Sequence, residues 1–186
     1  MISEEYQKQL VTLHESSVFG DMKTIPQDVK LLIEKYNISS ILDFGCGKGL
    51  LVDSLKKEFP EITVYGYDPS DPDKNTLPKK VDMILSFDVL EHIEPQFINE
   101  TLVSLKTICD KVMHHVIACH PAKRALSDGR NAHLIVEPPE WWKLKILETI
   151  NWNFSFEDTI SYVSNPKKGN PINVVKYKVT LINGNT

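Results

Sequence analysis

The chain has 186 residues, of which 41% are hydrophobic and 25% are charged, and its formal net charge is −4. This composition is typical of a globular chain of one domain, and the acidic balance argues against a surface that binds nucleic acid. The start of the chain is polar and acidic, and no apolar run reaches the roughly 18 residues of a membrane helix, so we expect neither a secretory signal nor a membrane partner.

Residues 1–37 predict a helical cap, and residues 38–186 predict a core that forms one domain with it. Apolar side chains recur at helical spacing in residues 3–17, and a second helix is predicted to begin near Pro26, because proline suits the first turn of a helix. We expect this cap either to act as a lid over the core or only to cover the end of the sheet.

In the core, segments with the apolar spacing of strands alternate with segments that have the apolar spacing of helices. The predicted order is a strand at 39–44, a helix at 48–59, a strand at 62–67, a loop at 69–80, a strand at 81–87, a helix from about 88 to 109, a strand at 112–119, a loop at 120–137, a helix that begins at Pro138, and strands at 151–163 and 173–182. Such alternation favours an α/β fold with a doubly wound, mostly parallel sheet. The turn at 165–171 is too short for a parallel crossover, so the last strand is predicted to be antiparallel.

The first core strand runs directly into a glycine-rich turn. Gly45, Gly47 and Gly49 allow close approach of a ligand to the backbone, because they carry no Cβ. Backbone N–H groups before a helix offer a positive site to a polar ligand. A dinucleotide fingerprint needs its third glycine where this chain has Leu50. The second core strand ends at Asp68, where an acid can accept hydrogen bonds from both ribose hydroxyls. The pattern therefore predicts a nucleoside-cofactor site.

With Asp43 before the glycines and Asp68 after them, this region resembles the class I S-adenosylmethionine (SAM)-dependent methyltransferases, which also end in an antiparallel strand. The alternative is a structural glycine loop in another α/β protein. The resemblance implies SAM as cofactor, bound by Asp43, Gly45, Cys46, Gly47, Gly49, Asp68, Pro69, Phe87 and Asp88. One departure is the segment 69–80, which is too short for the helix and strand that the family has there. We therefore expect the third strand of the family to be shortened or missing.

The segment after the strand at 81–87 carries a candidate metal site. If a helix begins near Asp88, then Asp88, Glu91 and His92 lie on one face of it. Two carboxylates and an imidazole can bind Mg, Mn or Zn. The segment is similar to one in small-molecule O-methyltransferases of the ubiquinone-biosynthesis type and to the metal site of small-RNA 2′-O-methyltransferases, which implies His133 as a further ligand. The alternative is a metal-free site in which the acids cap the helix and His92 packs beneath the cofactor.

The loop at 120–137 is predicted to hold the acceptor, because ligands of open α/β sheets bind beyond the carboxyl ends of the strands. We expect His120 or His133 to be the catalytic base or a metal ligand. Arg124 and Arg130 are candidates for binding an anionic part of the acceptor. Solvated loop charges are the alternative for each of these residues.

Trp141 and Trp142 are adjacent, so their side chains would lie about 100° apart on a helix. One ring can pack in the core while the other covers the pocket, and we name Trp142 as the candidate substrate contact. Core packing of both rings is the alternative.

The sequence therefore predicts a methyltransferase that moves a methyl group from SAM to a small hydroxylated metabolite or sugar. The alternatives are a non-catalytic SAM- or nucleoside-binding module, an RNA 2′-O-methyltransferase, for which the acidic composition is unfavourable, and a nicotinamide oxidoreductase. Three cysteines without disulfide or metal spacing, Cys46, Cys109 and Cys119, favour a cytoplasmic location. The sequence indicates no oligomeric state.

Overall fold

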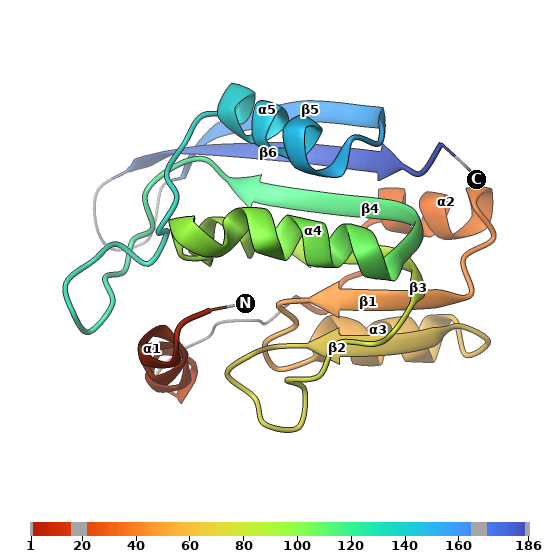
Figure 1. Cartoon of the computed structure of the whole chain (residues 1–186), viewed down its shortest axis with the longest axis horizontal. Coiled ribbons are helices and arrows are strands. Elements are labelled where there is room, and N and C mark those ends of the chain that lie inside the picture. Colours follow the sequence, from red (N-terminus) through yellow and green to blue (C-terminus); the bar gives the residue numbers. More distant parts are fainter. Residues whose placement is uncertain (1, 16–21, 165–170, 185–186) are drawn as a thin grey trace.

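The fold is built on a mixed sheet of six strands in the order β2-β1-β3-β4-β6-β5 (Figure 1). A computed structural model describes residues 2–15, 22–164 and 171–184 of the chain. The strands are β1 (Ser40–Phe44), β2 (Thr63–Tyr67), β3 (Val81–Phe87), β4 (Cys109–Ala118), β5 (Asn153–Ser164) and β6 (Ile172–Ile182). The first four are parallel to one another, and β6 is antiparallel to both β4 and β5, between which it lies. The predicted sheet with an antiparallel last strand is thus confirmed.

Helices cover both faces of this sheet. They are α1 (Glu4–Glu15), α2 (Gln27–Lys35), α3 (Leu50–Glu58), α4 (Ile98–Ile108) and α5 (Pro139–Ile150). In Figure 1, α4 and α5 lie in front of the sheet and α2 and α3 behind it, while α1 lies beyond the carboxyl ends of the parallel strands. None of the described helices is both long and apolar enough to cross a membrane.

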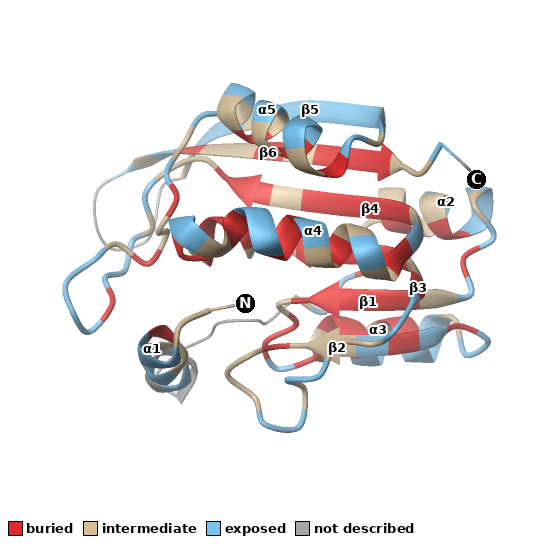
Figure 2. Cartoon of the chain, viewed as in Figure 1, coloured by how far each residue is buried: buried red, intermediate tan, exposed pale blue. Residues whose placement is uncertain are grey.

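Two apolar cores follow from this layering. Alternate residues of β6, Tyr177, Val179 and Leu181, pack with α4 and α5 on one face of the sheet. Val29 and Ile33 of α2 contribute to the core on the other face. Figure 2 shows buried residues along β1, β4 and β6, whereas β5 is exposed along most of its length. The central strands therefore form a rigid support for the segments that follow their carboxyl ends.

The prediction of one helix from about 88 to 109 is wrong at its start. Asp88 has φ 55°, a 3-10 turn spans Leu90–His92, a second spans Pro95–Phe97, and α4 begins only at Ile98. Pro95 explains the interruption, because a proline disfavours helical geometry in the residue before it, and Glu94 is extended at ψ 133°. The three candidate metal ligands Asp88, Glu91 and His92 therefore do not share one face of an α-helix.

The segment between β2 and β3 holds neither a helix nor a strand in residues 68–80, all of which the structure describes. The amide of Asp68 donates to the carbonyl of Lys74 (3.0 Å), and the amide of Lys74 donates to the carbonyl of Asp71 (3.0 Å). These bonds fold the segment into a compact turn beside the glycine loop. The third strand of the family fold is missing here, as expected, and most of the predicted turn at 165–171 lies outside the described residues.

Candidate active site

The glycine-rich loop after β1 has its amides bound within the protein. The amides of Gly45 and Cys46 donate to Tyr67 O (2.8 and 3.0 Å), that of Gly47 to Asp68 Oδ2 (2.9 Å), and that of Gly49 to Cys46 O (2.8 Å). These four N–H groups therefore already have partners within the protein, and binding of the cofactor by the loop residues stays a prediction. The loop instead offers backbone without side chains, against which a ligand can pack closely.

At two positions the neighbouring side chains leave no room for a Cβ, so only glycine fits. Gly45 has φ 79°, and a Cβ there would lie 2.5 Å from the methyl groups of Val89. Gly66, near the end of β2, faces the thiol of Cys46, and a Cβ would lie 2.8 Å from that sulfur. Sequence reasoning missed Gly66, because its requirement arises from a residue twenty positions away in the chain.

Two carboxylates flank the glycine loop. Asp43 is 4% exposed, and its burial, together with the neighbouring Asp68, raises the pKa of Asp43 to about 7. Asp68 accepts at Oδ1 from the amide and hydroxyl of Ser70 (2.9 and 2.6 Å) and at Oδ2 from the amide of Gly47. The acid expected to bind ribose is thus fixed in place by the loops beside it. A ligand hydroxyl would share these oxygens with protein donors.

A cleft of about 400 Å³ opens at the same edge of the sheet. Ala118 at the end of β4 pairs with Lys176 of β6, so this part of the antiparallel strand lies beside the carboxyl ends of the parallel ones. The cleft is lined by His92, His120, Ala122, Lys123, Arg124, His133, Tyr162, Ser164, Ile172, Val174 and Lys176. Both predicted catalytic histidines and one of the two predicted arginines thus border one cavity.

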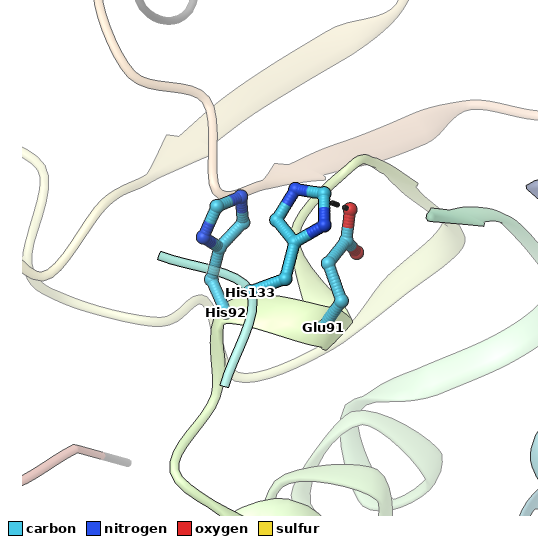
Figure 3. Close-up of side chains that lie close together, drawn as sticks. All are labelled: Glu91, His92 and His133. Atoms are coloured by element: carbon cyan, nitrogen blue, oxygen red, sulfur yellow. Dashed lines mark ion pairs between the residues drawn. The ribbon is translucent and has the colours of Figure 1, made fainter. Parts of the chain in front are cut away.

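Glu91, His92 and His133 come together beneath this cleft. Their candidate ligand atoms all lie within 4.8 Å of one another, and Nε2 of His133 is 4.0 Å from Oε1 of Glu91. Figure 3 shows the ring of His133 between His92 and Glu91, although His133 comes from the long loop and the other two from the 3-10 turn after β3. The rings of His92 and His133 meet edge to face, with centroids 4.8 Å apart.

The carboxylate of Glu91 is completely buried, and neither of its oxygens has a hydrogen-bond partner among the described residues. Burial, and next the charge of Asp88, raise the pKa of Glu91 well above its ordinary value. The backbone amides of Glu91 and Ala118 lower this pKa less than burial raises it. A buried carboxylate with so little compensation is costly unless it is protonated or binds a cation. This position therefore holds either a proton or a positive ligand.

The tautomers of two histidines follow from their backbone contacts. Nδ1 of His92 lies 2.7 Å from the carbonyl of Ala132, and Nδ1 of His133 lies 2.5 Å from the carbonyl of His120. A carbonyl only accepts, so each Nδ1 carries a proton and each neutral ring has its lone pair on Nε2. Rings fixed in this way are typical of metal-binding histidines.

Asp88 is placed differently from the sequence-based prediction. Its Oδ2 pairs with Nζ of Lys176 at 2.5 Å, and it does not belong to the group formed by Glu91, His92 and His133. The left-handed backbone at Asp88 turns its side chain toward β6, which explains why helical spacing gave the wrong geometry. The prediction of Asp88 as a metal ligand is therefore corrected to an ion pair with Lys176.

His120 directly follows the end of β4 and borders the cleft. Its Nδ1 lies 3.0 Å from the carbonyl of Val175, with a longer approach of 3.4 Å from the amide of the same residue. The shorter contact favours a proton on Nδ1 and a lone pair on Nε2. His133, whose ring centroid is 5.5 Å from that of His120, has a lowered pKa, first because of burial. Both rings are thus suited to accept a proton when neutral.

The remaining predicted substrate residues are separated by the fold. Arg124 borders the cleft, whereas Arg130 lies at the exposed tip of the loop and pairs with Asp128 at 2.7 Å. Trp142 is fully buried in the core shared by α4, α5 and β6, and it is not among the residues that line the cleft. Arg130 and Trp142 are therefore removed from the acceptor site, because ion pairing and core packing hold them elsewhere.

Helix α1, with Ser3 directly before it, contacts segments beside both parts of the site. Ser3 donates to Glu94 through its amide (2.7 Å) and its hydroxyl (2.9 Å), and Gln7 Nε2 donates to the carbonyl of Pro69 (2.6 Å). Tyr6 is 1% exposed and packs with Leu126 of the long loop. The helix thus joins the segment after β2 to the loop after β4.

Lys176, Lys123 and Tyr162 also border the cleft, and sequence reasoning missed them. The only signal in the sequence was the alternation of Lys176 and Lys178 with apolar residues along the last strand. That alternation places both lysines on one face of the strand but does not say which neighbours they meet.

Comparisons with known proteins agree with this architecture. The structure resembles that of 1,6-didemethyltoxoflavin-N1-methyltransferase from Burkholderia thailandensis, solved with 1,6-didemethyltoxoflavin and S-adenosylhomocysteine (TM-score 0.59, 12% identity, covering 98% of this chain and 91% of that one). It also resembles magnesium protoporphyrin IX methyltransferase from Synechocystis PCC 6803, solved with SAM (TM-score 0.54, 16% identity, covering 99% and 86%). At these identities the likeness establishes the fold. No curated protein sequence matches the chain.

The sheet with its inserted antiparallel strand and the glycine loop between two acids define a class I SAM-dependent methyltransferase. The chain belongs to the methyltransferase-domain family, whose model matches residues 21–158.

Proposed function

We propose that this methyltransferase transfers the methyl group of SAM to a hydroxyl group of a small metabolite or sugar. The observation that carries the proposal is the cleft lined by His92, His120 and His133 at the edge of the sheet where the glycine loop ends. A neutral imidazole beside an acceptor hydroxyl can remove its proton, which methylation of an oxygen requires.

The cofactor site in this proposal consists of the loop and the strand ends around it. Asp43, Gly45, Cys46, Gly47, Gly49, Asp68, Pro69, Phe87 and Asp88 are its proposed residues. Its glycines would allow close packing of the cofactor, and its two buried acids would attract the cationic methionine part and the ribose hydroxyls of SAM. SAM itself supplies the reactive methyl group on its sulfonium.

His120 is the proposed catalytic base. The acceptor oxygen attacks the methyl carbon as the carbon–sulfur bond breaks, the sulfur keeps the bonding electrons, and the hydroxyl proton passes to Nε2 of His120. The products are the methyl ether, S-adenosylhomocysteine and a protonated imidazole. His120 is favoured over His133 because Nε2 of His133 faces Glu91.

We further propose that Glu91, His92 and His133 bind a divalent ion such as Mn or Zn. The buried, unpartnered carboxylate and the fixed imidazole tautomers fit such an ion. When bound, the ion would supply positive charge that lowers the pKa of an acceptor hydroxyl. Mg is less suited, because it prefers a set of oxygen ligands.

The cap and the location complete the proposal. Residues 1–37 would act as a cap on the core of 38–186, because α1 contacts both Pro69 and Leu126. A cytoplasmic location suits the three cysteines, because all of them are free thiols.

Calorimetry with SAM, S-adenosylhomocysteine and NAD tests the cofactor, and transfer of labelled methyl from SAM to a panel of hydroxylated metabolites and sugars tests the reaction. We expect binding of the first two compounds and transfer to at least one acceptor. SAM binding with no transfer to the panel would favour a non-catalytic binding module, and transfer to RNA alone would favour a 2′-O-methyltransferase. Binding of NAD without SAM would overturn the proposal.

A further inference from the structure

The side chains around the cleft are unusual in their charge. The chain as a whole has more acidic residues than lysines and arginines, 25 against 21. The described residues that line the cleft nevertheless include Lys123, Arg124 and Lys176, and no aspartate or glutamate. The charged side chains that line the cleft are thus all basic, although one of them, Lys176, pairs with Asp88. The lysines and arginine come from two separate segments, the loop after β4 and strand β6.

Among these three basic residues, Lys176 also pairs with a neighbouring carboxylate. Its side chain is 23% exposed and borders the cleft, and on β6 it is paired with Ala118 of β4. Its ammonium pairs with Asp88 Oδ2 at 2.5 Å, which orients the group and uses one of its three protons. The other protons can serve a ligand in the cleft.

The remaining polar groups of the cleft are mostly donors. Lysine and arginine side chains have no acceptor atoms, and the hydroxyls of Tyr162 and Ser164 on β5 can both donate. The hydroxyls can also accept, and the Nε2 lone pair of His120 suits the proton of an acceptor hydroxyl. A ligand that complements this set must bring several acceptor oxygens together with one hydroxyl.

We propose that the methyl acceptor carries an oxyanion, a phosphate or a carboxylate, which Lys123, Arg124 and Lys176 bind while His120 faces the hydroxyl to be methylated. This inference rests on the proposed function and names the chemical class of its substrate. Charge-assisted hydrogen bonds to an oxyanion are stronger than neutral ones. Within this proposal Lys176 determines specificity and takes no part in the transfer of the methyl group.

The test measures binding of two probes, inorganic phosphate and malonate, by calorimetry on protein passed over a chelating resin, so that no divalent ion carries the anion. SAM binding is measured on the same samples. The variants are Lys176→Gln, the double change Lys123→Gln with Arg124→Gln, and the conservative Lys176→Arg. Arg130→Gln is the matched control, since it removes a cation of the same loop that lies outside the cleft.

We expect at least one probe to bind, about tenfold more weakly in Lys176→Gln and in the double variant, and within twofold of the original in Arg130→Gln and Lys176→Arg. A preference for phosphate would assign a phosphorylated acceptor, and a preference for malonate a carboxylated one. SAM binding with no binding of either probe, or equal weakening in Arg130→Gln, would overturn the oxyanion inference and leave the proposed function standing. Probe binding without SAM binding would overturn the proposed function instead. Thermal unfolding of each variant checks that the loss of the Asp88 pair has not unfolded the protein.

Discussion

The two halves of the candidate site satisfy their polar groups in different ways. Around the glycine loop, amides and carboxylates bind one another over short distances, as in the bonds of Asp68 to Gly47 and Ser70. Beneath the cleft, by contrast, both oxygens of Glu91 are buried without a hydrogen-bond partner among the described residues. The difference indicates that internal hydrogen bonds fix the shape of the cofactor half. In the acceptor half, by contrast, polar side chains have partners to gain from a ligand.

The two halves also differ in the free energy that their buried polar groups cost. Leaving one buried acceptor unpaired costs roughly 1–3 kcal/mol, and more for a charged group. A protein retains such groups mainly where function requires them, which favours a functional role for Glu91. Variants of each half therefore test whether this division is correct.

The largest effect is expected from His120→Asn. The amide nitrogen of asparagine can replace Nδ1 as a donor to the carbonyl of Val175, while Nε2 is lost. Methyl transfer should fall by about 10²–10⁴-fold because the base is missing. Initial rates with labelled SAM measure the loss, and calorimetry should find SAM affinity unchanged. A rate close to that of the original protein would remove His120 from the reaction.

Gly45→Ala should strongly affect the cofactor half. The new methyl group would contact Val89 at 2.5 Å on a backbone with positive φ, so we expect a loss of about 2–5 kcal/mol in the free energy of unfolding. Urea unfolding measures it. Gly129→Ala is the matched control, because Gly129 also has positive φ, 87°, but no atom lies within 4 Å of its Cβ position. Equal losses in the two variants would show that backbone strain alone, and not the packing of the loop, matters.

Asp43→Asn should change how stability depends on pH. Because the pKa of Asp43 rises from 3.8 to about 7 on folding, the folded state binds more protons than the unfolded state between these values. The free energy of unfolding should therefore fall as pH rises from about 4 to 7, by up to about 4 kcal/mol from this group. Unfolding in urea at several pH values should show a smaller decrease in Asp43→Asn. An identical pH profile for both proteins would contradict the raised pKa of the buried Asp43.

Glu91→Gln tests the metal proposal with a readout other than activity. At 100 times its dissociation constant, a divalent ion should stabilise the original protein by about 2.7 kcal/mol. Thermal unfolding with and without Mn or Zn measures this gain, which should vanish in Glu91→Gln and persist in Lys123→Gln. If chelation leaves both stability and turnover of the original protein unchanged, then Glu91 is a protonated acid and binds no ion.

Features that depend on neighbouring residues were predictable from the sequence. The glycine loop, its two acids, the strand at 81–87 and the antiparallel last strand all follow from local patterns, since turn geometry and strand periodicity involve only residues close in the chain. The helix predicted from about 88 was wrong, although Pro95 was a local signal against it.

Only the tertiary structure decided how the acceptor half is assembled. The meeting of His133 with Glu91, the pairing of Lys176 with Asp88, and the burial of Trp142 join segments that are far apart in the sequence. They depend on the insertion of β6 between β4 and β5 and on the return of the long loop over the 3-10 turn. A sequence pattern specifies which side chains share a face of one element, but the neighbours of that face are chosen by the packing of the whole chain.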